Sequence, residues 1–130
     1  METIIQSTKE FEQDLKALSN ADKETIINQM NQYFQLFLNE PEFLFNLKNL
    51  NQIKKLNLKN NYDSSLYSLR VNPNFRVILT IDDDPIFNRK DITLFRVVSS
   101  VEASNAYKKV ANVLYKDLMI EQEKVEFQPH

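Results

Sequence analysis

Residues 66–84, LYSLRVNPNFRVILTIDDD, constrain the fold of this chain more than any other segment. Two runs of strand-forming residues flank a short Asn-Pro-Asn connection. The odd positions of both runs are apolar: Tyr67, Leu69, Val71, Phe75, Val77, Leu79 and Ile81. A period of two is typical of strands with one buried face. The segment therefore predicts a β-hairpin over 66–71 and 75–82 whose odd-numbered face packs against helices.

The length of the turn determines the register of this hairpin. Residues that pair across a hairpin share a face, so their numbers must sum to an even value. A three-residue loop at 72–74 pairs Val71 with Phe75 and sets Arg70 opposite Arg76. A two-residue loop would pair Val71 with Arg76 and bury a charge. We therefore expect the two arginines to face each other on the open, even-numbered surface of the sheet.

A pair of facing arginines needs a physical reason, because like charges directly opposite each other destabilise a sheet, by roughly a few tenths of a kcal/mol. One interpretation is that each arginine pairs with an acid such as Asp82 or Glu102. A second is that both side chains extend into water. A third is that they form a binding site for phosphate or carboxylate, which guanidinium matches with two parallel hydrogen bonds.

The regions around the hairpin contain helical patterns. Ser7 and Glu10 match a capping box, so a helix is expected to begin near Thr8, after a short strand at 3–5. A second helix is predicted over about 26–38 and is ended by the Pro41 that follows. Residues 42–62 show no clean period and are expected to be irregular. Because the chain has no glycine, asparagines are the candidate turn formers: Asn60, Asn61, Asn72 and Asn74.

A third strand is predicted at 92–98, where Arg96 is expected to pair with an acid. A last helix should begin at Ala103, with one apolar stripe: Ala106, Tyr107, Val110, Val113, Leu114 and Leu118. The order β-α-α-β-β-β-α predicts an α+β fold, in which a small antiparallel sheet is packed on one face by N-terminal helices and is followed by a C-terminal helix. One domain over 1–120 and a flexible tail at 121–130 account for all 130 residues.

Composition excludes several kinds of chemistry. The chain has no cysteine, so it has no disulfide, no thiolate nucleophile and no cysteine-bound zinc. Its one histidine is His130, which removes internal imidazole as a base. The absence of glycine excludes glycine-rich phosphate loops. The acidic run Asp82-Asp83-Asp84 is interpreted as a polar turn before Pro85, so no metal and no cofactor are expected.

The charge distribution and the hydropathy of the chain limit the kinds of partner and the location that we expect for it. The net charge is −2, but residues 48–90 hold eight cations against four acids, so the middle of the chain is basic. No apolar run approaches the length of a membrane span, and the first ten residues lack a secretory signal, so a cytoplasmic protein is expected. Phe43 and Phe45, which follow the helix-ending proline, are candidates for a surface that binds a partner protein.

The ordered set LYSLRVNPNFRVILTIDDD, ITLFRVVSSVEASNAY and FEQDLKAL resembles the RelE/ParE toxin superfamily over about residues 66–107 and 11–18. The resemblance implies a toxin of a type II toxin–antitoxin pair, restrained by a cognate antitoxin. The RelE branch cleaves mRNA on the ribosome, and the ParE branch inhibits DNA gyrase. A non-catalytic protein-binding module on the same fold is the alternative from another class.

Residue by residue, the resemblance implies that Arg76 and Tyr107 are catalytic. Arg76 would stabilise the scissile phosphate, and Tyr107 would stack on a base or assist proton transfer. Arg70, with Lys54 and Lys55, would bind RNA phosphates. The chain departs from the family pattern at two places: Leu66 and Ser68 stand where RelE-like nucleases have lysines, and residues 99–102 (SSVE) stand where they have a second arginine or a histidine.

Overall fold

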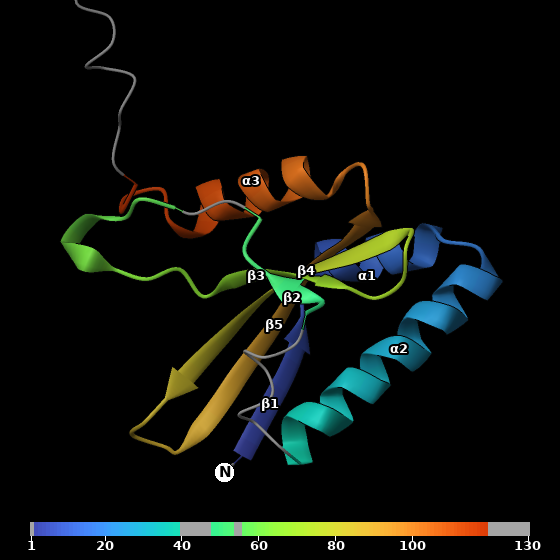
Figure 1. The fold of residues 1–130 in the computed structure, drawn as a ribbon, viewed down its shortest axis with the longest axis horizontal. Helices are drawn as coiled ribbons and strands as arrows, with labels where there is room; N and C mark the ends of the chain where they lie inside the picture. Colours follow the sequence, from blue (N-terminus) through green and yellow to red (C-terminus); the bar gives the residue numbers. More distant parts are fainter. Residues whose placement is uncertain (1, 40–47, 54–55, 120–130) are drawn as a thin grey trace, which may run out of the picture.

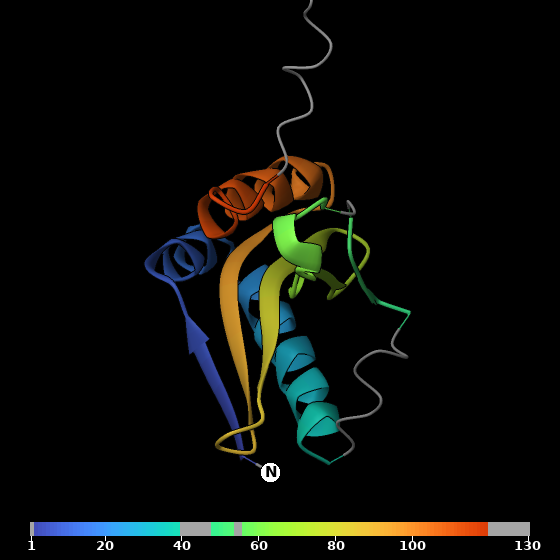
Figure 2. The ribbon, with the colours of Figure 1, turned by 90° about the vertical axis from the view of Figure 1, so that its left-hand side faces the viewer.

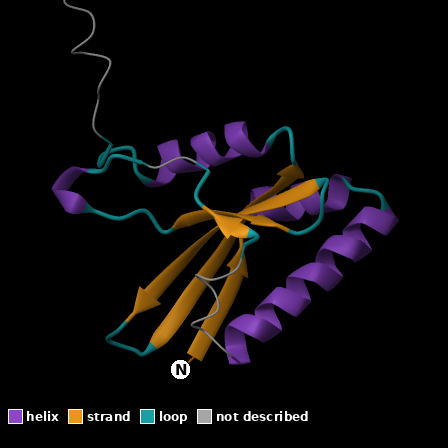
Figure 3. Ribbon diagram, in the orientation of Figure 1, coloured by secondary structure: helices purple, strands orange, loops and turns teal. Residues whose placement is uncertain are grey.

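A five-stranded sheet forms the centre of the computed structural model, which describes residues 2–39, 48–53 and 56–119 (Figure 1). The strands are β1 (Glu2–Ser7), β2 (Leu50–Asn51), β3 (Leu66–Arg70), β4 (Phe75–Asp84) and β5 (Arg89–Ser99). The helices are α1 (Lys9–Ala17), α2 (Asn20–Asn39) and α3 (Ala103–Leu114), with a short 3-10 turn at Lys59–Asn61. The α+β class and the order of the predicted elements are confirmed (Figure 3).

The strand order is β1-β5-β4-β3-β2, and the sheet is mixed. The expectation of an antiparallel sheet holds for β2 to β5, but β1 pairs in parallel with β5, from Glu2 beside Arg89 to Ser7 beside Leu94. The hairpins leave the outer edge of β5 open, and β1 fills that edge. Its direction delivers the chain to α1, where the Thr8 amide donates to the Leu94 carbonyl.

The odd-numbered face of the hairpin packs against α1 and α2, as predicted. The largest buried cluster joins helix residues to strand residues: Phe11, Ile26, Met30 and Phe37 with Leu69, Val77, Leu79, Ile81, Ile92 and Leu94. Figure 2 shows α2 running along the strands, while α3 lies across one end of them. The N-terminal helices α1 and α2 therefore cover the odd-numbered face of the hairpin, and α3 makes a second contact with the sheet.

That second contact corrects the expectation that the even-numbered face is open. Leu66 and Ile78 on this face are fully buried beneath α3, in a cluster with Ala106, Tyr107 and Ala111. Small alanines allow the helix to lie close to the sheet. The predicted stripe is wrong at Val113, which is 80% exposed. The even-numbered face is therefore open at the turn end of the β3–β4 hairpin and, at the other end of β4, at the exposed Asp82.

The predicted register of this hairpin is confirmed. Arg70 pairs with Arg76, and the Val71 amide donates to the Phe75 carbonyl at 3.3 Å. The side chain of Asn72 accepts from the amides of Asn74 and Phe75, at 2.8 Å each, so an asparagine closes the turn without glycine. β4 continues to Asp84, so the acidic run predicted to be a turn is the end of the strand.

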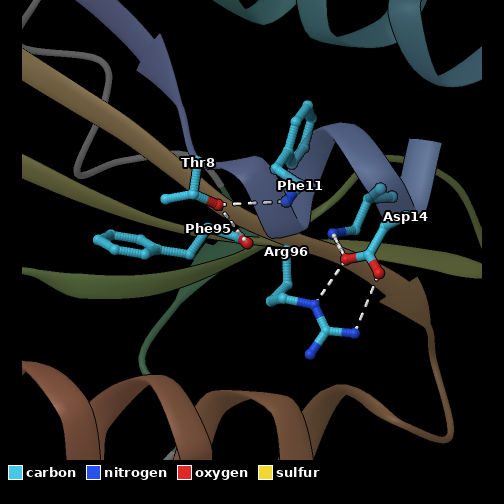
Figure 4. A network of polar contacts seen from close by, with 6 residues as sticks. Thr8, Phe11, Asp14, Phe95 and Arg96 are labelled. Carbon is cyan, nitrogen blue, oxygen red and sulfur yellow. Dashed lines mark hydrogen bonds and ion pairs between the residues drawn. The ribbon is translucent and has the colours of Figure 1, made fainter. Parts of the chain in front are cut away.

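Helix α1 is attached to β5 by side-chain contacts (Figure 4). Thr8, one residue after the predicted cap, accepts from the Phe11 amide and donates to the Phe95 carbonyl. Asp14 receives two hydrogen bonds from the guanidinium of Arg96, at 2.6 and 3.1 Å, and one from the Val97 amide. This confirms the predicted acid partner of Arg96. The hydrogen bond with Asp14 raises the pKa of Arg96.

Two predictions concern residues outside the described ranges: the tail at 121–130 and the partner-binding candidates Phe43 and Phe45 lie there. Among the helices described, none is both long enough and apolar enough to cross a membrane.

Candidate functional site

A cleft of about 370 Å³ lies at the turn end of the hairpin, on the face that α3 leaves open. It is bordered by β2, by the facing ends of β3 and β4, and by the start of α3. Among the residues that the structure describes, three cations line it: Lys48, Arg70 and Arg76. The other lining residues are uncharged: Asn49, Asn51, Ile53, Ser68, Ser100, Ala103 and Ser104. Within residues 2–39, 48–53 and 56–119, the lining carries three positive charges and no carboxylate, which favours an anionic ligand.

Arg70 is exposed, and its backbone is held on both sides. Its amide donates to the Asn49 carbonyl at 2.7 Å, and its carbonyl accepts from the Tyr33 hydroxyl at 3.2 Å. The side-chain amide of Asn49 donates to the same Tyr33 hydroxyl at 2.7 Å. Tyr33 on α2 therefore ties the end of β3 to the segment that contributes Lys48 and Asn49 to the cleft.

Arg76 is half-buried, and one end of its guanidinium contacts the hairpin turn. Nη1 donates to the carbonyls of Asn72 and Phe75, at 2.9 and 3.0 Å. Within the described residues, the Nε and Nη2 atoms of Arg76 donate no hydrogen bond. The turn therefore orients the guanidinium and leaves two nitrogens for a ligand.

Neither arginine of the pair forms an ion pair with an acid in residues 2–39, 48–53 or 56–119. The interpretation that each is neutralised by a nearby carboxylate such as Asp82 or Glu102 is not supported within those ranges. The structure instead places both side chains on the wall of one cleft, as the phosphate interpretation requires.

The first turn of α3 borders the same cleft through Ala103 and Ser104. No acidic residue lies in this turn, and Glu102 at the N-cap position makes no side-chain capping bond. The amides at the start of a helix have no intrahelical acceptors and carry partial positive charge. They add to the positive potential that Lys48, Arg70 and Arg76 create.

Tyr107 lies elsewhere. Its side chain is fully buried between α3 and the sheet, and its hydroxyl donates to the Leu66 carbonyl at 2.9 Å. Burial raises the pKa of Tyr107 to about 12. This tyrosine does not line the cleft, so its predicted contact with a nucleotide stays a prediction. The predicted phosphate ligands Lys54 and Lys55 lie outside the described residues.

The sequence patterns did not assign two residues of the cleft, Lys48 and Ser68, to a functional site. Lys48 belongs to the basic region at 48–90, but no sequence pattern predicts that it lies beside the arginines. Ser68 was noted only as a departure from the family's lysines. The alternation of the strand contained the signal, because Ser68 shares the even-numbered face with Arg70 and Arg76. Its side chain lies on the wall of the cleft, and the residue is only 3% exposed.

The described lining of the cleft offers groups that bind anions. Among the described lining residues there is no carboxylate, histidine or tyrosine. Guanidinium and ammonium groups supply charge-assisted hydrogen bonds to phosphate oxygens. The arrangement therefore fits a ligand with one phosphate and neutral hydrogen-bonding groups around it.

No protein-family model matches the sequence, and no curated protein is significantly similar to it. Solved structures are similar in fold. The crystal structure of YafQ from E. coli strain BL21(DE3) superimposes with a TM-score of 0.51 at 13% identity, over 78% of this chain and 98% of that one. The YoeB/ParE toxin from Agrobacterium tumefaciens gives 0.50 at 11% identity, over 76% and 98%.

An archaeal RelE–RelB complex from Pyrococcus horikoshii OT3 also matches, with a TM-score of 0.46 at 18% identity, over 76% of this chain and 96% of that one. The first two comparisons show that this chain shares the α+β fold of the YafQ and YoeB/ParE toxin structures, at low sequence identity.

Proposed function

We propose that this protein is a toxin of a type II toxin–antitoxin pair that binds single-stranded RNA through the cleft of Lys48, Arg70 and Arg76. The observation that carries the proposal is the arginine pair, held on one wall and left without acid partners in the described parts of the chain. The name of the A. tumefaciens structure, a YoeB/ParE toxin, supports the toxin assignment.

Phosphate is the group that the cleft matches best. Arg76 offers Nε and Nη2, and Arg70 faces it across the hairpin, so one phosphate can accept from both guanidinium groups. Lys48 adds a third charge to the lining. In cleavage of mRNA on the ribosome, the same contacts would stabilise the charge that develops on the scissile phosphate.

The partner proposed to restrain this activity is a cognate antitoxin protein. Its identification begins with the neighbouring open reading frame, where a small gene for a DNA-binding protein is expected. Co-expression with that gene should relieve growth arrest. If co-expression leaves the arrest unchanged, the neighbouring protein is not the antitoxin.

A second candidate function is a non-catalytic protein that retains the fold and binds a partner. The observation that favours it is the absence of a base or an acid among the described residues of the cleft, since cleavage through the 2′-hydroxyl needs both. Tyr107, the predicted proton-transfer group, is buried and donates to a carbonyl. A third candidate function is inhibition of DNA gyrase, as in ParE-like proteins, because that activity would not need the ribonuclease residues.

Induced expression in bacteria distinguishes these functions. Wild type should arrest growth, and Arg76→Ala should abolish the arrest. Arg89→Ala is the matched control, because Arg89 lies at the opposite end of β5 from the strand's contact with Arg76. Arrest with cleaved mRNA identifies the ribonuclease, and arrest with intact mRNA and inhibited supercoiling identifies the gyrase inhibitor. Growth that is unaffected by wild type contradicts the toxin assignment and supports the binding protein.

A further inference from the structure

The turn between β4 and β5 holds two large apolar side chains in water. Ile86 is 85% exposed and Phe87 is 69% exposed. The turn is ordered, because Oδ1 of Asp84 accepts hydrogen bonds from the amides of both residues, at 3.2 Å each. The guanidinium of Arg89 lies over the Phe87 ring, 5.6 Å from its centroid. Contiguous apolar surface that is held in water is typical of a site that a partner covers. We call Ile86 and Phe87 the β4–β5 tip.

An apolar groove of about 380 Å³ lies between α1 and α3, over β5. Its apolar lining comes from β5 and the second half of α3: Phe95, Val110, Val113 and Leu114. The other lining residues are Thr8, Glu10, Arg96 and Lys109, and Figure 4 shows Thr8, Phe95 and Arg96 among them. Val113 is 80% exposed and Leu114 is 37% exposed, so this α3 groove also presents apolar side chains to water.

The tip and the groove are too far apart to meet within one molecule. Arg89, which follows the tip, and Phe95, in the groove, lie at the two ends of a stretch of β5 that is roughly 20 Å long. Figure 1 and Figure 2 both show the β4–β5 turn at the end of the sheet away from α3. The tip of one molecule can therefore enter only the groove of another molecule.

The segments that carry the tip and the groove have opposite charge. Residues 82–91, which contain the tip, hold four aspartates and two cations, a balance of −2. Residues 103–119, which contain α3, hold three lysines and one aspartate, a balance of +2. Lys109 lines the groove itself. A second copy of this chain therefore offers the tip both an apolar groove and the opposite charge. The acidic segment around the tip would be repelled by nucleic acid or by an anionic membrane.

We propose that two copies of this chain form a dimer in which the β4–β5 tip of each copy lies in the α3 groove of the other. A twofold axis makes the contact reciprocal, so one dimer contains it twice. A buried aromatic side chain contributes about 150–250 Å². With Ile86 and the groove surface included, two contacts bury on the order of 1,200 Å², the lower end of specific interfaces. The dimer is therefore reversible and forms in a concentration-dependent way.

Sedimentation velocity of the full chain, from micromolar to submillimolar concentration, tests this proposal. Wild type should shift from the monomer mass to the dimer mass as the concentration rises. Phe87→Ser removes the ring from the tip, and Val113→Glu puts a carboxylate in the groove, where it repels the acidic segment around the tip. Each variant should raise the dissociation constant of the dimer by roughly tenfold or more. Both residues are exposed, so stability should be unchanged, which denaturant unfolding checks.

Val101→Glu is the matched control, because Val101 is 86% exposed and does not line the groove. It should form dimers as wild type does. The lining of the Lys48, Arg70 and Arg76 cleft includes the start of α3 and none of the groove residues, so the proposal does not depend on what the cleft binds.

Mixing the two variants distinguishes a tip-in-groove contact from any other interface. The intact tip of Val113→Glu can enter the intact groove of Phe87→Ser, so the mixed dimer retains one of the two contacts. It should form more tightly than the dimer of either variant alone. A monomeric wild type, variants that form dimers as wild type does, or a mixture that associates no better than its components would overturn the proposal. Monomeric wild type that binds phosphatidylcholine vesicles through Phe87 would also overturn it and would assign the tip to a membrane.

Discussion

Arg70 lies directly opposite Arg76 across the β3–β4 hairpin, and neither forms an ion pair with a carboxylate in the described parts of the chain. Three other described cations, Arg89, Lys90 and Arg96, have acid partners. Arg96 is bound by Asp14, and Lys90 lies 2.6 Å from Asp83. The two facing arginines differ from these three cations, which is consistent with the proposal that an anion from outside the chain binds them.

The arginine pair depends on Tyr33, which supports it from α2. Tyr33→Phe removes the hydroxyl that accepts from Asn49 and donates to the Arg70 carbonyl. We expect the free energy of unfolding to fall by about 1 kcal/mol, and RNA affinity to fall because Lys48 and Asn49 are no longer held beside Arg70. Denaturant unfolding and RNA titration measure the two effects.

Tyr62→Phe is the control for this prediction, because Tyr62 is 55% exposed and does not line the cleft. It should change neither quantity. RNA affinity that is unaltered in Tyr33→Phe would show that Tyr33 stabilises the fold without positioning the cleft.

The attachment of α1 to β5 should depend on Asp14. Asp14→Ala leaves the guanidinium of Arg96 and the Val97 amide without their acceptor. Hydrogen bonds to charged groups contribute roughly 1.5–3 kcal/mol each at partly buried positions, and losses in one network do not add. We expect unfolding to become easier by about 2 kcal/mol. A double-mutant cycle with Arg96→Ala should give a clear coupling energy, and a coupling near zero would contradict the role of this pair.

Alkaline titration tests the environment of Tyr107. Burial raises its pKa in the folded protein to about 12, above the ordinary tyrosine value of 10.0. A group with a raised folded pKa stabilises the fold fully below its unfolded pKa, and that contribution is lost as the pH rises through the folded pKa. Stability should therefore decrease between about pH 10 and 12.

The measurement is tyrosinate absorbance with unfolding followed in parallel. In wild type, Tyr107 should ionise later than the exposed tyrosines, and Tyr107→Phe should remove its step near pH 12. If a late step near pH 12 persists in Tyr107→Phe, the source is another tyrosine such as Tyr67, whose pKa burial also raises.

Much of this fold could be predicted from local patterns. The alternation at 66–82 gave the hairpin, and the parity of its turn gave the pairing of Arg70 with Arg76. Hydrophobic spacing gave α2. These features depend on neighbouring residues in the chain, so they are encoded locally.

The errors arose where distant segments meet. The parallel pairing of β1 with β5 joins residues about 87 positions apart, and no local pattern specifies it. The cover of the even-numbered face by α3 depends on Leu66 and Ile78, two apolar residues in an otherwise polar series. The cleft itself exists because Lys48, the hairpin and α3 converge.

The salt dependence of RNA binding tests the central claim most directly, because each phosphate contact adds to the slope of log affinity against log salt. For a single strand, each neutralised phosphate contributes roughly 0.7 to that slope. If Arg70 and Arg76 hold phosphate, each alanine variant should weaken binding and flatten the slope by up to about 0.7, with Arg89→Ala unchanged. An affinity and a slope that stay at their wild-type values in the Arg70→Ala, Arg76→Ala double variant would contradict the account.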